Sequence, residues 1–323
     1  MSDDDAIEPA DGDVLEVLIP SSLAAIRVDR VLSFLTGVSR SEAVAMLASG
    51  GVALDERVVL KPSTLVEEGQ RLVAIVPRAD SAALEPEPEV SVDVVIDDAD
   101  FVVVDKAPGQ VVHPGAGQRR GTLVAGLLAR YPELRALRDE GLCDPQRPGV
   151  VHRLDKGTSG LLVVAKTPEG YLSLRDQIAT RQMERVYVGL VEGHVAEERG
   201  VIDAPIGRSL RAPTLMEVRA DGRPARTAYE VIARYERPSA VTLLRLRLET
   251  GRTHQIRVHV AAIAHPIVND PRYGHRPDRR LAEGRFFLHS ATLAFAHPRS
   301  GQRVKATAKL PADLAELVPG ADL

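Results

Sequence analysis

The chain breaks into two parts at an acidic, proline-rich stretch. Over residues 79–90 Ala, Pro and Glu alternate, and no basic residue occurs. Such a sequence is typical of an extended linker between domains. We therefore expect four parts: a disordered acidic tail over residues 1–16, a small domain over 17–78, the linker over 79–90 and a larger domain over 91–323.

Charge is distributed unevenly over these parts. Residues 1–16 hold seven acidic residues and no basic one, whereas residues 101–323 hold 34 basic against 24 acidic residues, although the whole chain has a formal net charge of −4. Of those 34 basic residues, 29 are Arg, whose planar guanidinium makes two-point contacts with phosphate oxygens. The larger domain therefore has the charge of a protein that binds a polyanion. The alternative is that Arg replaces Lys on an ordinary solvated surface.

The small domain has the pattern of two helices followed by short strands. Apolar residues recur with helical spacing over 24–36 and 41–49, and Ser39 with Glu42 three residues later forms a capping box for the second helix. Short β-rich segments follow at 52–54, 58–60 and 71–76. A unit of about sixty residues has little room for chemistry, so we expect it to bind a partner.

Strands dominate the larger domain. The segment 241–249 alternates apolar residues with charged ones, as a half-buried antiparallel strand does. Other β segments lie at 101–105, 160–165, 185–191 and 228–235, and helical segments lie at 123–129, 170–180 and 253–264. Since strands outnumber helices and do not alternate regularly with them, we expect an α+β fold around a mixed or antiparallel sheet rather than a doubly wound fold.

The sequence lacks the signals of several protein classes. There is no apolar run of about eighteen residues and the first residues are acidic, so we expect neither a membrane span nor a secretory signal. A single cysteine, Cys143, excludes an internal disulfide and favours a reducing cytoplasm. His254, His259 and His265 do not share a helical face, and no HExxH, phosphate-binding loop or dinucleotide-binding turn occurs. We therefore expect no metal and no other cofactor.

The densest polar cluster lies in the segment 147–160. Within it Asp155 is flanked by Arg153 and Lys156, and nearby positive charge favours the ionised form of a carboxylate. Asp155 is therefore a candidate nucleophile or base. The alternative is that Asp155 only caps a turn or pairs with Arg153.

A second polar cluster covers residues 249–259. Thr253 is placed to cap a helix that begins there, so Arg252 and Arg257 would lie around a helix N-terminus. Backbone donors and cationic side chains at such a position favour an anion.

The two clusters resemble motifs of the RluA/RluD family of RNA pseudouridine synthases. The segment 152–160, HRLDKGTSG, resembles the family signature. Other family motifs are matched in the same order at 103–109, 112–115, 185–193, 250–259, 265–268, 273–274, 287–290 and 297–298. The similarity runs from about residue 90 to 312. Residues 17–78 resemble an S4 RNA-binding domain, on segments 27–32, 39–41 and 50–55, and the order of S4 domain, linker and catalytic domain is that of the RluD branch.

The resemblance implies a pseudouridine synthase that detaches uracil from ribose and rejoins it through C5 without a cofactor. It implies that Asp155 is the nucleophile or base and that Arg257 pairs with it. It also implies that Tyr187 stacks on the uracil and that Arg153 helps to extrude the base from the RNA. Further residues implied to contact the RNA or the extruded base are His152, Thr158, Arg252, His254 and Gln255. The RNA-binding residues implied for the S4 domain are Arg27, Arg30, Ser39 and Arg40.

The implied partner is RNA. The domain order favours large-subunit (23S) ribosomal RNA or the assembling large subunit, in the cytoplasm, with no membrane and no obligate protein partner. Alternatives are the same reaction on tRNA and a non-catalytic RNA-binding ribosome-assembly factor that keeps the fold. An Asp-dependent glycosidase would need a second carboxylate as acid, and none stands out near either cluster.

Four positions depart from the family pattern. Asp105 stands for the usual Asn, Gly157 for a common Asp, Arg185 for the usual Lys and Ala264 for the Gly that ends the third-motif helix. Because a left-handed C-cap disfavours Ala, we expect that helix to end differently here.

Overall fold

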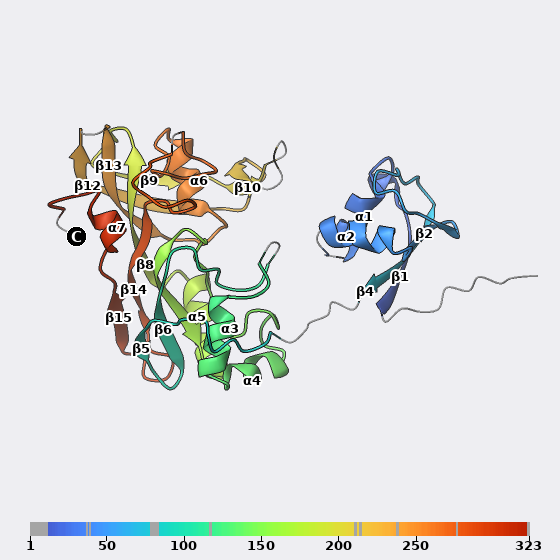
Figure 1. Ribbon diagram of the computed structural model, residues 1–323, viewed down its shortest axis with the longest axis horizontal. Coiled ribbons are helices and arrows are strands. Elements are labelled where there is room, and N and C mark those ends of the chain that lie inside the picture. The colour runs from blue at the N-terminus through green and yellow to red at the C-terminus, as the bar shows by residue number, and fades with distance from the viewer. Residues whose placement is uncertain are drawn as a thin grey trace, which may run out of the picture. The chain divides into compact units, whose positions relative to one another are not determined.

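The computed structural model describes residues 12–36, 38, 40–77, 84–115, 118–209, 212, 215–236, 239–275 and 277–321. The chain divides into two compact units, Met1–Ala83 and Leu84–Leu323 (Figure 1). None of the helices in the described ranges combines the length and the apolar composition that crossing a membrane requires.

The small unit is a four-stranded sheet with two α-helices. In sheet order its strands are β1 (Gly12–Leu18), β4 (Arg71–Pro77), β2 (Val52–Leu54) and β3 (Arg57–Val58). A 3₁₀ turn, η1 (Ser21–Leu23), precedes the helices α1 (Val28–Thr36) and α2 (Arg40–Ala48). Buried apolar side chains of both layers, among them Leu32, Leu47 and Leu72, form the core. The predicted order of two helices and short strands is confirmed, and Ser39 lies outside the described residues.

The expected tail over residues 1–16 is wrong at its C-terminal end. Residues 12–16 belong to β1, which pairs with β4 along its whole length. Leu15 and Val17 pack against the core of the small unit, and the Glu16 carboxylate accepts a hydrogen bond of 2.8 Å from Arg71 Nε. Leu15 and Val17 lie two residues apart and therefore share the half-buried face of the strand, but Val14 and Leu18 are apolar on the other face. The sequence does not show a clean alternation here, and the acidic composition obscured the strand.

The expected linker over residues 79–90 also ends too late. Leu84 and Glu87 are buried in the larger unit, and the Glu87 carboxylate accepts hydrogen bonds from the Gly121 amide at 2.6 Å and from Arg120 Nε at 3.2 Å. Helix α3 (Leu123–Arg130) packs against Val90, since a Cβ on Gly126 would lie 2.8 Å from the Val90 carbonyl oxygen. An Ala-Pro-Glu composition therefore does not stop this segment from packing as extended chain.

A nine-stranded mixed sheet forms the centre of the larger unit. In sheet order its strands are β5 (Val94–Asp97), β6 (Phe101–Lys106), β7 (Ser159–Ala165), β14 (Leu288–Ala296), β8 (Glu184–Glu192), β13 (Val241–Leu248), β12 (Arg226–Tyr235) and β9 (Arg199–Asp203), and β15 (Arg303–Thr307) also pairs with β14. β14 and β7 run parallel, and the other strand pairs of this sheet are antiparallel. Two short strands, β10 (Ile206–Arg208) and β11 (Met216–Val218), form a separate hairpin. The predicted α+β fold around a mixed sheet is confirmed.

The helices divide between the two ends of this sheet. Helices α3, α4 (Leu134–Asp139) and α5 (Pro168–Ala179) gather beside β5 and β6, whereas α6 (Gln255–Ala262) lies toward β9 and β10, and α7 (Ala312–Ala315) follows β15 (Figure 1). The side chains of Thr122 and Thr167 cap α3 and α5 by accepting hydrogen bonds from backbone amides. Leu127, Leu162 and Leu174 belong to the main core between helices and sheet.

The ends of α6 differ from the prediction. The N-cap is His254 rather than Thr253, and its φ of 55° is left-handed. At the other end Ala264 has a φ of 66° and completes a Schellman motif, since the Ala264 and His265 amides donate to the carbonyls of Ala261 and Val260. The prediction that Ala264 would end this helix differently is therefore wrong: the two capping hydrogen bonds offset the steric cost of the left-handed Ala.

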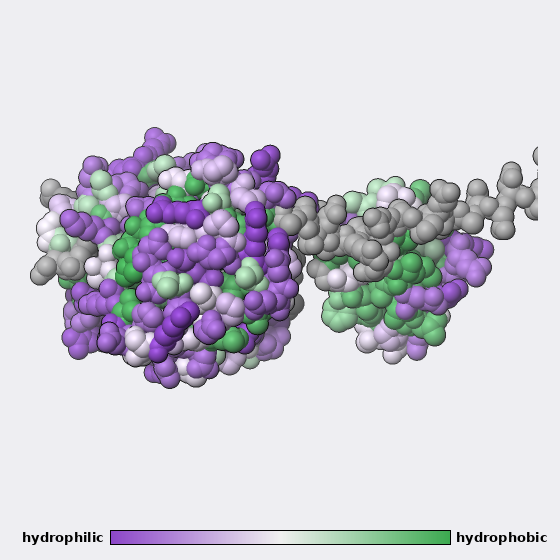
Figure 2. Space-filling view, turned by 90° about the horizontal axis from the view of Figure 1, so that it is seen from below, coloured by the Kyte–Doolittle hydropathy of each residue, from purple (hydrophilic) through white to green (hydrophobic). Residues whose placement is uncertain are grey.

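The surfaces of the two units differ in character. In Figure 2 the larger unit presents a mostly hydrophilic face, while many apolar residues are visible on the small unit. Exposed apolar side chains of the small unit include Leu18, Phe34 and Leu60.

Candidate active site

Asp155 lies on a tight loop that leads into β7. The Thr158 amide donates a hydrogen bond of 3.0 Å to the Asp155 carbonyl, which closes the turn. Gly157 is required in this turn because a Cβ there would collide with the Gly284 carbonyl and the Phe286 ring. The turn therefore places the Asp155 carboxylate, 19% exposed, at the surface of a pocket.

Two buried basic side chains, Lys106 and Arg285, hold this loop in place. Lys106 Nζ donates to the carbonyls of Ala107, Gln110 and Lys156 at 2.8, 2.9 and 3.4 Å, and burial lowers the pKa of Lys106 to about 7. Arg285 Nη1 donates to the Gly157 carbonyl at 2.9 Å and Nη2 donates to Ser159 Oγ at 3.0 Å. These hydrogen bonds end on backbone and hydroxyl groups, so they fix the loop and do not occupy the oxygens of the Asp155 carboxylate.

Asp155 is paired with Arg257, which is also paired with Asp270. Arg257 Nη1 donates to Asp155 Oδ2 at 2.9 Å, and Nε and Nη2 donate to the two Asp270 oxygens at 2.7 and 2.8 Å. The guanidinium also lies 4.4 Å from the centre of the Phe286 ring. The resemblance implied the first pair. The alternative pairing of Asp155 with Arg153 is wrong, because Arg153 Nη1 approaches His113 Nε2 instead, at 3.3 Å.

Asp270 is a site residue that sequence reasoning missed. Its side chain is fully buried and also accepts hydrogen bonds from the Arg272 and Tyr273 amides at 2.9 and 3.1 Å. Burial is the largest single influence and acts to raise the pKa of Asp270. The hydrogen bonds and charge of Arg257, together with the Arg272 and Tyr273 amides, outweigh burial and hold this pKa below the usual value. Asp270 lies between two segments, 265–268 and 273–274, that the family comparison had singled out, and this position was the signal that could have found it.

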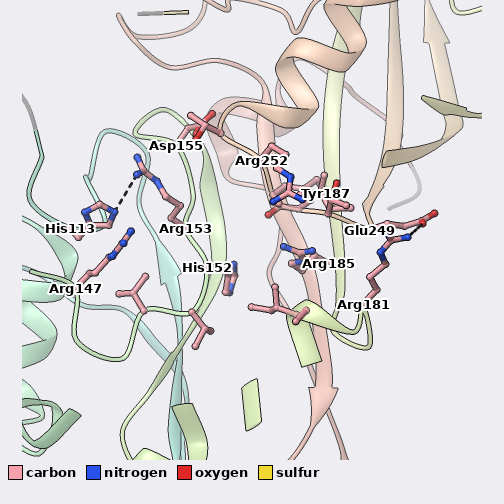
Figure 3. A pocket seen from close by; sticks show the side chains of 18 residues that line it. His113, Arg147, His152, Arg153, Asp155, Arg181, Arg185, Tyr187, Glu249 and Arg252 are labelled. Carbon is pink, nitrogen blue, oxygen red and sulfur yellow. Dashed lines mark hydrogen bonds and ion pairs between the residues drawn. The ribbon is translucent and has the colours of Figure 1, made fainter. Parts of the chain in front are cut away.

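Tyr187 lies on β8 and lines the pocket with Asp155 (Figure 3). The pocket has a volume of about 390 Å³, and a smaller hollow of about 50 Å³, which shares some of its lining residues, is lined by Asp155, Tyr187 and Arg257. Tyr187 is 4% exposed, and burial raises its pKa above the usual value. The phenol is therefore neutral, and its ring at the pocket wall is of a kind that stacks on planar ligands.

Arginine side chains surround the mouth of the pocket. Arg147, Arg153 and Arg181 are exposed, and Arg252 is half-buried, with its Nε donating to the Pro224 carbonyl at 3.0 Å. Figure 3 shows Arg153 directed toward His113 and Arg181 beside Glu249. The mouth is therefore cationic and suited to a polyanion.

The remaining predicted residues are held by hydrogen bonds within the protein. His152 Nε2 accepts from the Val163 amide at 3.2 Å, and burial lowers the pKa of His152 to about 3, so its ring is neutral. Gln255 accepts from Thr250 Oγ1 and the Arg252 amide at 2.7 and 3.0 Å, which fixes the loop before α6.

Thr158 and His254 complete this set. Thr158 is buried and lines the smaller hollow, and His254 Nδ1 lies 2.8 Å from the Tyr273 hydroxyl. Each predicted site residue of the larger unit therefore lines the pocket or the smaller hollow that shares residues with it.

The predicted RNA-binding residues of the small unit are only partly free. Arg27 Nη2 and Arg40 Nε both lie 3.0 Å from Asp29 Oδ2, and Asp29 is buried. Arg30 is exposed on α1, and Ser39 lies outside the described residues. Asp29, in α1, therefore links this helix to α2 through Arg40 and also binds Arg27, which directly precedes α1.

The three histidines considered as metal ligands do not meet. His259 bonds Thr227 Oγ1 and the Ala204 carbonyl, and His265 bonds the Glu192 carbonyl. Within the described ranges one group of potential ligands, Asp98, Asp100 and His297, is close enough to share an ion. The Asp100 carboxylate is already bonded to Thr167 Oγ1 and Arg299 Nε, both at 2.9 Å, so this group is accounted for without a metal.

Comparisons with known proteins identify the family of this chain. Residues 100–262 match the model of the RNA pseudouridylate synthase family, and residues 26–72 match that of the S4 domain. A protein of Xanthomonas campestris named ribosomal large subunit pseudouridine synthase D is 40% identical, over 98% of this chain and 95% of its own length. An RNA pseudouridine synthase of Chloroflexus aurantiacus is 44% identical, over 97% of this chain and 96% of its own length.

A solved structure shares the fold. It is that of human RNA Pseudouridylate Synthase Domain Containing 1, which has a TM-score of 0.55 and 28% identity over 70% of this chain and 86% of its own. The family model covers half of the chain, and the curated relatives cover nearly all of it. The chain therefore belongs to the RNA pseudouridylate synthase family and is an RNA-modifying isomerase with an S4 domain.

Proposed function

We propose that this protein isomerises uridines of large-subunit (23S) ribosomal RNA to pseudouridine in the cytoplasm, with Asp155, Arg257 and Tyr187 as its catalytic group. The observation that carries the proposal is the contact of Arg257 with Asp155, at 2.9 Å, beside Tyr187 in one arginine-lined pocket. The name of the Xanthomonas campestris relative supports ribosomal RNA as substrate.

Asp155 acts on the sugar in this proposal. The reaction breaks the bond between C1′ and N1, turns the uracil and joins C5 to C1′. An ionised carboxylate serves either route, attack on C1′ or removal of a ribose proton. Arg257 aims the carboxylate, and Asp270 fixes Arg257 from the opposite side of the guanidinium.

Tyr187 and Arg153 act on the base. The neutral phenol ring of Tyr187 stacks on the extruded uracil and keeps it in the pocket while it turns. Arg153 is exposed at the mouth, where its side chain can enter the RNA and fill the place of the extruded base. The other mouth arginines contact phosphates of the surrounding RNA.

Tritium release tests this function. Large-subunit ribosomal RNA, assembling large-subunit particles and tRNA are each prepared with tritium at C5 of uridine, and release is measured with the full-length protein. We expect release from ribosomal RNA or its particles and none from tRNA. Asp155→Asn should abolish release while RNA affinity stays within about threefold, and Asp139→Asn, on an exposed carboxylate, is the matched control.

The other outcomes separate the alternatives. Release from tRNA alone would replace the substrate but keep the reaction. Binding without release from any of the three RNAs would favour a non-catalytic assembly factor. Release by Asp155→Asn at the wild-type rate would remove Asp155 from the catalytic group.

A further inference from the structure

Arg185 is a buried cation without a counter-charge. It lies on β8 two residues before Tyr187, so both side chains emerge on the same face of the strand and line the same pocket (Figure 3). Arg185 is 3% exposed, and its Nε is buried without a hydrogen-bond partner. Among the described residues no carboxylate forms an ion pair with it.

Other buried cations of this unit have partners. Arg257 contacts two carboxylates, Arg285 contacts Asp313 and two groups of the Asp155 loop, and Lys106 contacts three carbonyls. Burial of a charge without a partner destabilises a fold, so such a group is expected where a ligand completes it. In the free protein the Arg185 guanidinium therefore lacks, among the described residues, a hydrogen-bond acceptor at Nε and a counter-charge, and a ligand that enters the pocket would supply them.

The surroundings fix the Arg185 guanidinium in place. A Cβ on Gly251 would lie 2.9 Å from Arg185 Nη1, so the loop between β13 and α6 packs directly on the guanidinium. The neighbouring His152 is neutral, and Arg185 contributes to the low pKa of that ring. In this structure Arg185 is therefore buried under the Gly251 loop rather than directed to the mouth of the pocket. A ligand that contacts it has to enter the pocket.

Because Arg185 is buried in the pocket, only a part of the RNA that enters the pocket contacts it. Arg147, Arg153 and Arg181 are exposed at the mouth, where we expect the sugar-phosphate backbone to lie. Arg185 and Tyr187 are buried to nearly the same extent, 3% and 4%. An extruded base enters a pocket while its phosphates stay at the surface, so the group that meets Arg185 is part of the base.

We propose that Arg185 donates a hydrogen bond to O4 of the extruded uracil and thereby both selects uracil and stabilises it as a leaving group. This inference rests on the proposed function. Cytosine carries an amino group at C4, which is a donor and repels a guanidinium N–H. Selection against cytosine therefore follows from the donor character of Arg185.

The same contact assists bond breakage. When the C1′–N1 bond breaks, its electron pair stays on the uracil and spreads from N1 through C6 and C5 to O4. The positive charge of Arg185 stabilises this anion, and the pair is used again when C5 bonds to C1′. Arg185 gives up no proton. After C5 has bonded to C1′, C5 loses its proton to water and N1 takes up a proton from water, so the product is an isomer of the substrate.

Single-turnover tritium release with Arg185→Met tests the catalytic part. We expect the rate to fall about 100-fold, while RNA affinity and its salt dependence stay unchanged. Arg185→Lys should recover part of the rate. In RNA with 4-thiouridine at the target position, sulfur replaces O4 and accepts hydrogen bonds poorly, so the wild type should lose more rate than Arg185→Met does. Equal losses in the two proteins would overturn the O4 contact.

Phosphate binding by Arg185 would give a different pattern. Arg185→Met would then weaken RNA binding and lower the salt slope by about one, with an unchanged single-turnover rate, and this result would overturn the assignment.

Thermal unfolding of the full-length protein tests the role of Arg185 without an activity measurement. Removal of an unpaired buried charge should raise the melting temperature of Arg185→Met by about 2–4 °C, whereas a structural role for Arg185 would lower it and overturn the inference. If the wild type releases no tritium from any RNA, the proposed function fails, and the sign of this shift still supports or overturns a ligand role for Arg185.

Discussion

Arg257 and Arg185 are each 3% exposed, and they serve the same pocket in opposite ways. Arg257 is held between Asp155 and Asp270, whereas no described carboxylate approaches Arg185. Arg257 has its carboxylate partners before RNA binds, whereas in our proposal the substrate supplies the partner of Arg185. A site that must aim a carboxylate and also receive an extruded base thus separates the two tasks between two guanidinium groups.

The strongest test of this comparison is Arg257→Met. It leaves the Asp155 and Asp270 carboxylates near each other without the cation between them, so we expect a loss of about 3–5 kcal/mol of unfolding free energy. The rate of tritium release should fall by at least about 1,000-fold, because the Asp155 carboxylate is no longer oriented by the Arg257 guanidinium. Urea unfolding and single-turnover release measure the two effects.

Arg257→Lys provides the control for charge. A single ammonium cannot make the bidentate contact with Asp270 and also reach Asp155, so this variant should keep more stability than Arg257→Met but little activity. A variant that recovered full activity would show that charge alone, without geometry, suffices on the Arg257 side.

Asp270→Asn should have the next largest effect. The amide preserves the shape of the side chain but offers one acceptor oxygen, so Arg257 loses half of its anchoring contact. We expect the rate to fall by about 10- to 100-fold, as is found when a group that orients a catalytic residue is changed, with RNA affinity unchanged. An unchanged rate would mean that Asp155 and the Phe286 ring position Arg257 by themselves.

Sequence reasoning reached some parts of this site and not others. The order of the elements and the grouping of Asp155, Tyr187 and Arg257 followed from local patterns and motif resemblance. Asp270 was missed because it meets Arg257 through folding of the segment after α6, which no local spacing encodes. The Schellman end at Ala264 was missed because propensity alone ignores the capping hydrogen bonds.

The absence of a carboxylate partner for Arg185 among the described residues could not be predicted from the sequence either. A sequence shows which charges exist but not which of them the fold leaves unpaired. The same holds for the segment 84–90, where composition predicted a linker and the buried Glu87 carboxylate shows packed chain instead.

The loss of stability in acid tests the surroundings of Arg185, because His152 lies beside it and Arg185 contributes to the low pKa of His152. The folded protein keeps His152 neutral, with a pKa of about 3, whereas an unfolded chain takes up the proton near its ordinary value of about 6.5. Stability is therefore full above about pH 6.5 and is lost as the pH falls toward 3, by up to about 2 kcal/mol between pH 7 and 5. His152→Gln keeps an acceptor for the Val163 amide and should lose that much less over the same range. Urea unfolding at the two pH values decides, and equal losses in both proteins would show that His152 is protonated in the fold.

The smallest expected effect belongs to Arg147, at the mouth of the pocket. Arg147 is exposed and its Nε lies 3.1 Å from Asp144, so water screens its charge before RNA binds. Arg147→Gln should raise KM by about two- to fivefold and lower the salt slope of RNA binding by about one, while the single-turnover rate at saturating RNA stays the same. Arg185→Met is expected to do the reverse, with a lower rate and unchanged binding. If both variants changed only KM, burial would not distinguish arginines that read the base from arginines that hold the backbone, and the division between the floor and the mouth of this pocket would have to be abandoned.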